Sequence, residues 1–310
     1  MLRTAAPLSA LLLAPLLLSI GCGDSRPAPS TPFSGMDSQP STSKTRDAEG
    51  ALTGLDAALD ATRTLPPAQC LERQRALGPR VASTVDACAG TRFENKAVYI
   101  QAQWCFNFND DGAGVDAALD RLEGLEQPLF KRSGRALRVQ HLLREERRVP
   151  ARAMAETLVG ELPEFTFLLG MVRWHERIGG TVESTRGVGL DGVEVDPAAG
   201  SERWVLYVHL AVWNDQAVFT VQRWLQAIGD RDIRLVPVVR DGSAKRMASD
   251  LAAMPAAAAH AVPLYCRSQA EVDRVLKEWQ PPLDGWTVLL DRDRRIARVE
   301  VRPGDLASVE

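Results

Sequence analysis

Apolar residues recur at helical spacing through the first half of the chain. From residue 51 to about residue 176 they fall every three or four positions, and strand-like alternation is scarce. The clearest runs are Leu52, Leu55 and Leu59; Val81, Val85 and Cys88; Val115, Leu119 and Leu122; and Phe165, Leu168, Leu169 and Val172. This pattern predicts an all-α domain of about five or six helices over residues 51–177.

The pattern changes beyond residue 178, where strand-like and helix-like segments alternate. Strands are predicted at 203–212, 233–239, 262–265, 286–290 and 296–301, and helices at 218–228, after Ser243 and after Ser268, where Glu271 completes a capping box. Alternation of strand and helix favours a largely parallel sheet, and the last two strands form an antiparallel pair. Residues 178–310 are therefore expected to form an α/β domain.

The order of these elements resembles the thioredoxin fold, and several residues resemble its periplasmic branch. That branch comprises TlpA and ResA type proteins, which are related to peroxiredoxins of the AhpC/TSA type. In it, a hairpin with a Leu-Asp-Gly turn leads to a strand ending Phe-Trp-Ala-x-Trp-Cys-x-x-Cys. Here 190–192 match the turn, Ala211 the Ala and Trp213 the second Trp, while 288–296 are similar to a later segment. The resemblance covers 178–310 and implies a central mixed sheet with flanking helices.

The redox positions implied by this resemblance are degenerate. Asn214 stands at the nucleophilic cysteine, Ala217 at the resolving cysteine and Gly285 at the cis-proline, while Asp215 and Gln216 fill the two positions between the cysteines. Dithiol exchange requires a thiolate and a second thiol, which an amide and a methyl group cannot replace. The usual site is therefore expected to be redox-inactive, with Trp213 as a packing residue.

A rival hypothesis is a thiol-dependent oxidoreductase or peroxiredoxin-like enzyme that uses Cys266. This cysteine precedes the predicted helix after Ser268 and adjoins Arg267, and a helix dipole and a nearby cation both lower a thiol pKa. The alternatives are a disulfide partner or a buried thiol. Whether the protein is an enzyme stays open at this point, and no catalytic residue other than Cys266 is assigned.

Residues 1–22 resemble a lipoprotein-type signal peptide. Arg3 precedes an apolar run that suits a secretory signal and is short for a membrane span. Small residues before Cys22 resemble the lipobox of bacterial lipoproteins, with Ser19 at the usual Leu position. The resemblance implies an exported protein that is membrane-anchored in the periplasm by a lipid on Cys22, and Gly23 slightly favours the outer membrane over the inner. A plain cleaved signal that leaves an unmodified Cys22 is the alternative.

Residues 23–50 are rich in proline and serine and contain almost no large apolar side chains, which predicts a disordered tether. The composition of the 310 residues is otherwise ordinary, with 45% hydrophobic and 25% charged residues. A formal net charge of −3 gives no reason to expect nucleic acid. The expected partner is an unknown envelope protein, and contact with the membrane is expected only through the lipid anchor.

Four cysteines besides Cys22 are disulfide candidates, since an even number in an exported protein suggests two bridges: Cys70, Cys88, Cys105 and Cys266. One bridge with two buried thiols is the alternative.

Residues 107–112 match the opening of a calcium loop, but Ala118 stands where a bidentate Glu is needed, and a polar turn that caps the next helix explains them equally well. The four histidines lack zinc-ligand spacing, so no metal or cofactor is expected.

Overall fold

The computed structural model describes residues 43–62, 65, 67–109, 111–182, 185–199, 204–266 and 282–309. The signal-peptide and Cys22 predictions, and the helix expected after Ser268, lie outside these residues. The contacts divide the chain into two units. One comprises the described residues up to Glu145 together with Ala153–Glu164, and the other comprises Glu146–Arg152 together with the described residues from Phe165 onward.

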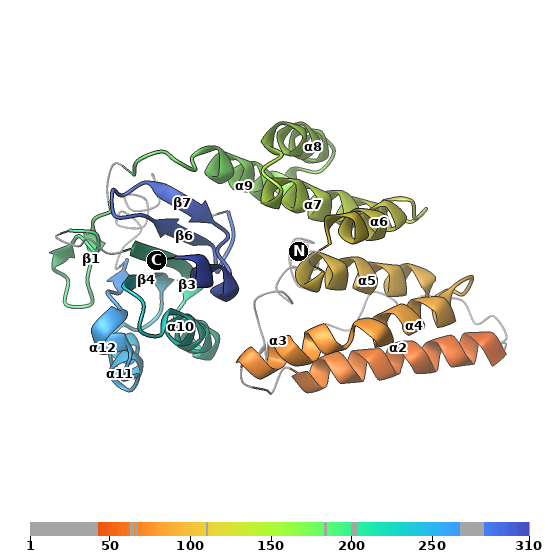
Figure 1. The fold of residues 1–310 in the computed structure, drawn as a ribbon, viewed down its shortest axis with the longest axis horizontal. Helices are drawn as coiled ribbons and strands as arrows, with labels where there is room; N and C mark the ends of the chain where they lie inside the picture. The colour runs from red at the N-terminus through yellow and green to blue at the C-terminus, as the bar shows by residue number, and fades with distance from the viewer. Residues whose placement is uncertain are drawn as a thin grey trace, which may run out of the picture. The chain divides into compact units, whose positions relative to one another are not determined.

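The first unit is helical (Figure 1). Its helices are α2 (Ser43–Thr62), α3 (Pro67–Ala76), α4 (Gly78–Cys88), α5 (Glu94–Phe108), α6 (Gly112–Glu123), α7 (Pro128–Arg144) and most of α8 (Arg148–Glu161). The apolar stripes of α2, α4, α5, α6 and α7 form one core, in which Leu52, Val85, Val98 and Leu119 are buried. Residues 43–50, which the sequence assigned to the tether, form the first part of α2, and Ala48 is fully buried in this core.

Residues 107–112 form a helix cap. Asn107 lies within α5, and the carboxylate of Asp111 accepts hydrogen bonds from the backbone N–H groups of Ala113 and Gly114, each at 3.2 Å. Helix α6 therefore begins at Gly112, three residues earlier than the apolar pattern indicates. A polar turn that caps the next helix, the alternative to calcium binding, accounts for this segment, because the Asp111 carboxylate already accepts hydrogen bonds from the first turn of α6.

One cation joins α6 to α7. The Arg138 guanidinium contacts Asp116 at 2.8 Å, Asp120 at 2.6 Å and Glu123 at 2.5 Å, and its side chain is 14% exposed. Burial alone would lower the pKa of Arg138, but the hydrogen bond and charge of Glu123 and the two other carboxylates raise it. This network fixes the pairing of the two helices.

The second unit begins with α9 (Thr166–Glu176), preceded by a short 3-10 turn (Pro163–Phe165), and contains a five-stranded sheet. A two-stranded hairpin of β1 (Gly187–Val188) and β2 (Glu194–Val195) precedes it. The sequence placed α9 with the preceding helices, whereas its contacts are with the sheet. His175 Nε2 lies 3.2 Å from Glu300 Oε2, and just beyond α9 the N–H of Gly179 bonds to the carbonyl of Ile296 at 2.8 Å.

The sheet order is β5-β4-β3-β6-β7. The parallel strands are β3 (Trp204–Val212), β4 (Ile233–Asp241) and β5 (Leu264–Tyr265), while β6 (Thr287–Leu290) and β7 (Ile296–Val299) run antiparallel to their neighbours. The connecting helices are α10 (Asp215–Ile228), α11 (Ala244–Ala252) and α12 (Ala257–His260), and the 3-10 helix η3 (Pro303–Ser308) follows β7. The expected mixed sheet with flanking helices is confirmed.

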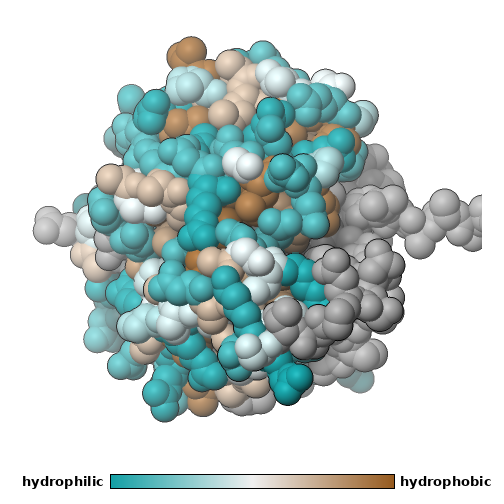
Figure 2. All heavy atoms as spheres, turned by 90° about the vertical axis from the view of Figure 1, so that its right-hand side faces the viewer, coloured by the Kyte–Doolittle hydropathy of each residue, from teal (hydrophilic) through white to brown (hydrophobic). Residues whose placement is uncertain are grey.

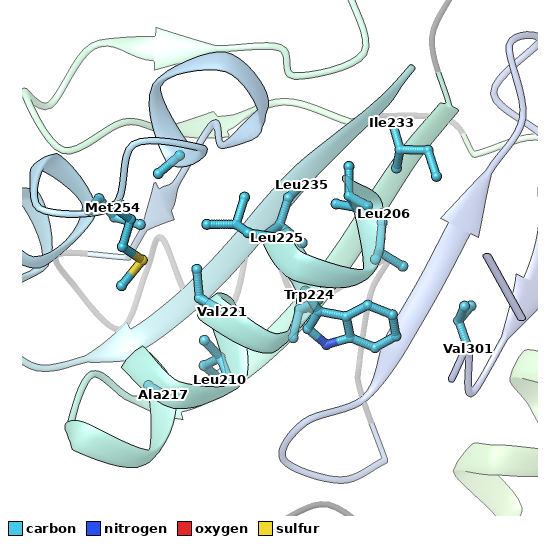
Figure 3. Close-up of a cluster of buried hydrophobic side chains, with 14 of the residues drawn as sticks. Leu206, Leu210, Ala217, Val221, Trp224, Leu225, Ile233, Leu235, Met254 and Val301 are labelled. Atoms are coloured by element: carbon cyan, nitrogen blue, oxygen red, sulfur yellow. The ribbon is translucent and has the colours of Figure 1, made fainter. Parts of the chain in front are cut away.

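Helix α10 covers one face of this sheet (Figure 3). Val221 and Leu225 of the helix pack toward Leu206, Leu210 and Leu235 of the central strands, and all five are buried. Burying such side chains stabilises the fold by roughly 1.5–3 kcal/mol each. The helix is thereby held with its N-terminus at the carboxyl end of β3.

No helix in the described part of the chain is long and apolar enough to cross a membrane. On the face that Figure 2 shows, hydrophilic residues dominate and hydrophobic ones appear between them in small groups.

Candidate binding site at the start of helix α10

Trp213 joins β3 to α10 and is fixed from three sides. Its backbone N–H bonds to the carbonyl of Asp241 at 2.9 Å, and its indole Nε1 donates to Asp250 Oδ2 at 2.8 Å. A Cβ added to Gly242, whose φ is +128°, would lie 3.0 Å from the Trp213 Cβ. With 3% of its surface exposed, Trp213 belongs to the core under α10.

Asn214 is the N-cap of α10. Its backbone is extended, and its side-chain Oδ1 accepts a hydrogen bond from the backbone N–H of Ala217 at 3.0 Å. Asn214 is exposed, whereas Ala217 is buried in the core. The amide therefore satisfies one of the helix N–H groups that would otherwise lack an acceptor.

Asp215 and Gln216, which lie between Asn214 and Ala217, are exposed to different degrees. The Asp215 carboxylate is 98% exposed and pairs with Arg246 of α11, while Gln216 is half-buried. Arg246 also lies 3.5 Å from Asp250, which accepts from Trp213. A continuous polar chain thus connects the start of α10, helix α11 and the indole. The spacing of Arg246 and Asp250, four residues apart on a helix, was the available sequence signal for it.

Gly285 lies beside the same end of β3. Its φ is +75°, and its N–H bonds to the carbonyl of His209 at 2.7 Å. The adjacent Asp284 carboxylate accepts the N–H of Ala211 at 2.6 Å. The loop before β6 therefore approaches the strand that leads into α10, although a glycine occupies the place where the family resemblance implies a proline. Sequence reasoning missed Asp284.

The sequence predicts two disulfides among the cysteines. Within the described residues, Cys88, Cys105 and Cys266 are not disulfide-bonded. Burial, followed by the charge of Glu94, raises the pKa of Cys88, and burial raises that of Cys105, so both thiols resist ionisation. The structure therefore shows no bridge among Cys88, Cys105 and Cys266 in the described part of the chain, and the disulfide map stays a prediction.

Cys266 directly follows β5. Its backbone N–H bonds to the carbonyl of Val239 at 3.0 Å, and the residue is 5% exposed. A reacting peroxide or disulfide must reach the sulfur of a nucleophilic cysteine, and this burial opposes that role. Arg267 and the following helix lie outside the described residues.

The site as a whole offers hydrogen-bonding groups and a carboxylate around a rigid helix start. Within the described ranges no group of three or more His, Cys, Asp and Glu residues could hold a metal ion. At the start of α10, Asn214, Asp215 and Gln216 offer two amides and a carboxylate.

The topology defines the class of this unit. A parallel β3-α10-β4 crossover, with β6 antiparallel beside β3 and β7 at the edge, gives the strand order of a thioredoxin-like fold. The first turn of the helix after the central strand, where that fold carries its reactive cysteines, here holds Asn214 and Ala217.

The similarity of this chain to known proteins is low. No family model matches the chain, and no curated protein matches it. Four solved chains are similar, among them the following three. A thiol:disulfide interchange protein from Bacteroides sp. has 17% identity and TM-score 0.34, with 42% of this chain and 84% of that chain covered. The thioredoxin domain of a thiol-disulfide oxidoreductase from Bacteroides vulgatus has 20% identity and TM-score 0.30, with 42% and 91% covered. A thioredoxin-like protein from Bacteroides caccae has 9% identity and TM-score 0.37, with 91% and 96% covered.

Proposed function

We propose that this protein is an exported thioredoxin-like binding module whose α10 site carries out no dithiol exchange. The observation that supports the proposal is the hydrogen bond from the N–H of Ala217 to Oδ1 of Asn214. A thiolate at position 214 would accept the same N–H, which is how a helix start lowers a thiol pKa. In Asn214 a neutral amide oxygen accepts this N–H instead, and the residue has no nucleophilic sulfur.

The partner is proposed to be another protein of the cell envelope. Around the buried Trp213, the outward-facing side chains are Asn214, Asp215 and Val212, whose exposed fraction is 43%. A rigid strand end and a capped helix hold them, which favours recognition because little conformational entropy is lost on binding. Lipid attachment at Cys22, with the tether after it, would keep this surface at the membrane.

The redox half of the proposal is tested by insulin reduction. The protein without its signal peptide is expected to show no turnover. The variant Asn214→Cys/Ala217→Cys is expected to gain turnover, because both thiols then stand on the first turn of α10. Asn214→Ser, which keeps a capping oxygen, is the matched control and stays inactive. Turnover by the parent protein that disappears in Cys266→Ser would instead support the thiol enzyme.

The binding half is tested by crosslinking in the host envelope. A photoreactive residue at position 216 is expected to yield one discrete adduct. The same residue at Glu194, an exposed position on the β1–β2 hairpin, is the control. Equal labelling from both positions, or none from 216, would contradict a partner at the α10 site.

A further inference from the structure

The face of the sheet opposite α10 carries a polar cluster that the proposed function does not use. Leu206, Val208 and Leu210 of β3 belong to the core under α10, so the alternating His209 lies on the other face. By the same alternation Arg240 shares that face, because Val239 belongs to the α10 core. At this place the carboxyl end of β3 lies between the carboxyl end of β4 and the start of β6.

Strand register brings Trp286 to the same place. The N–H of His209 bonds to the carbonyl of Trp286 at 2.9 Å, so these two residues lie opposite each other on neighbouring strands. Arg240 lies one strand away, diagonal to His209, between the register pairs Leu210–Val239 and Val212–Asp241. Opposite and diagonal neighbours on one face are within reach of long and aromatic side chains.

Among the described residues, no acceptor is found for two of these groups. Within the part of the chain that the structure describes, the indole Nε1 of Trp286 is buried and has no hydrogen-bond partner, and the side chain is 3% exposed. The ion pairs between described residues do not include the half-buried Arg240. Leaving a buried N–H without an acceptor costs about 1–3 kcal/mol, so such a group calls for an acceptor from elsewhere.

The neighbouring imidazole adds no competing positive charge. Burial, and secondarily the charge of Arg240, lowers the pKa of His209 to about 3, so the ring is neutral near pH 7. The cluster thus combines one cation, one N–H donor and a neutral ring.

We propose that an oxyanion, a carboxylate or a phosphate group, binds between Arg240 and the indole N–H of Trp286. The guanidinium fork matches the planar oxygens of such groups, and the indole supplies a further donor. This site lies on the other face of the sheet from the residues that α10 covers, so it is independent of the proposed binding function.

The test is a titration followed by NMR on uniformly ¹⁵N-labelled protein. Trp286→Phe identifies the indole N–H resonance of Trp286 by its disappearance, and contacts to the β3 strand identify it if that variant does not fold. Sodium acetate and inorganic phosphate are added separately at constant ionic strength, with chloride as the reference. A saturable shift of this resonance with acetate indicates a carboxylate ligand, and one with phosphate indicates a phosphate ligand.

Two variants make the result specific. Arg240→Met is expected to abolish saturation, whereas Arg186→Met, which removes a cation already paired with Glu194, should leave it intact. In a thermal-shift titration, Trp286→Phe should weaken the apparent affinity about tenfold, the effect of one hydrogen bond to a charged group. A response equal to that of chloride, or one that survives Arg240→Met, would overturn the site and leave a bound water as the acceptor.

Discussion

Stability of the sheet unit should fall with acidification because of one residue, His209. In the folded protein burial, followed by the charge of Arg240, lowers the pKa of this imidazole from 6.5 to about 3. In the unfolded chain it returns to its ordinary value. Between these two values the unfolded chain binds a proton that the native state does not, so the free energy of unfolding decreases as the pH decreases.

The magnitude follows from the same two values. Each pH unit in this window contributes about 1.4 kcal/mol, so the loss between pH 6.5 and pH 3 reaches at most roughly 5 kcal/mol. That is a large share of the stability of a typical domain, which is about 5–15 kcal/mol. Other groups also titrate in this range, so the prediction concerns the difference between wild type and a variant.

The variant is His209→Leu, which keeps the side-chain size and removes the titrating nitrogen, and His209→Gln replaces it if the first does not fold. Urea unfolding is measured from pH 7 to pH 4 by tryptophan fluorescence, because all the described tryptophans except Trp104 belong to the sheet unit. The slope of stability against pH is expected to be smaller in the variant by about 1.4 kcal/mol per pH unit. His260→Leu controls for the loss of a histidine as such. Equal slopes in wild type and the His209 variant would refute the reasoning.

Three further outcomes are expected. Asn214→Ala should lower the urea-derived stability by about 1 kcal/mol through loss of the α10 cap, whereas Asn214→Ser should recover most of it; no difference between the two would contradict capping. Arg138→Met should destabilise the helical unit by roughly 1–3 kcal/mol in far-UV circular dichroism, since it breaks three ion pairs from a largely buried cation. Arg135→Met, which breaks one half-exposed pair with Glu161, should cost less than about 1 kcal/mol. In the native protein, alkylation should modify the half-buried Cys105 first, as peptide mapping would show. Early labelling of Cys266 would instead support the hypothesis of a thiol-dependent enzyme.

The sheet could be predicted from the sequence because its strands are long apolar runs with helical stripes between them. Residues 205–210 and 235–239 are buried on both faces in the structure, as expected of parallel strands covered by helices. The helix that starts after Trp213 could also be predicted, since its apolar stripe ends at a glycine.

Other features depended on tertiary contacts that local pattern does not encode. Residues 43–50 are polar enough to be interpreted as a tether, yet they belong to the helix that buries Leu52 and Leu55, and Ala48 of this segment is buried with them. Disulfide pairing depends on distances between helices, so an even cysteine count alone does not predict which cysteines pair. The contact between Asp284 and Ala211 joins residues far apart in the chain, and its sequence signal is only an aspartate before a glycine.

The amide of Asn214 at the start of α10 determines whether binding of a partner there depends on redox conditions. A dithiol changes its charge and its hydrogen bonding whenever it is oxidised or reduced, so the surface around it differs between the two states. Asn214 has no second oxidation state and no charge to gain or lose near neutral pH. The first turn of α10 therefore presents the same face in oxidising and reducing surroundings, and affinity for a ligand there should not vary with redox potential.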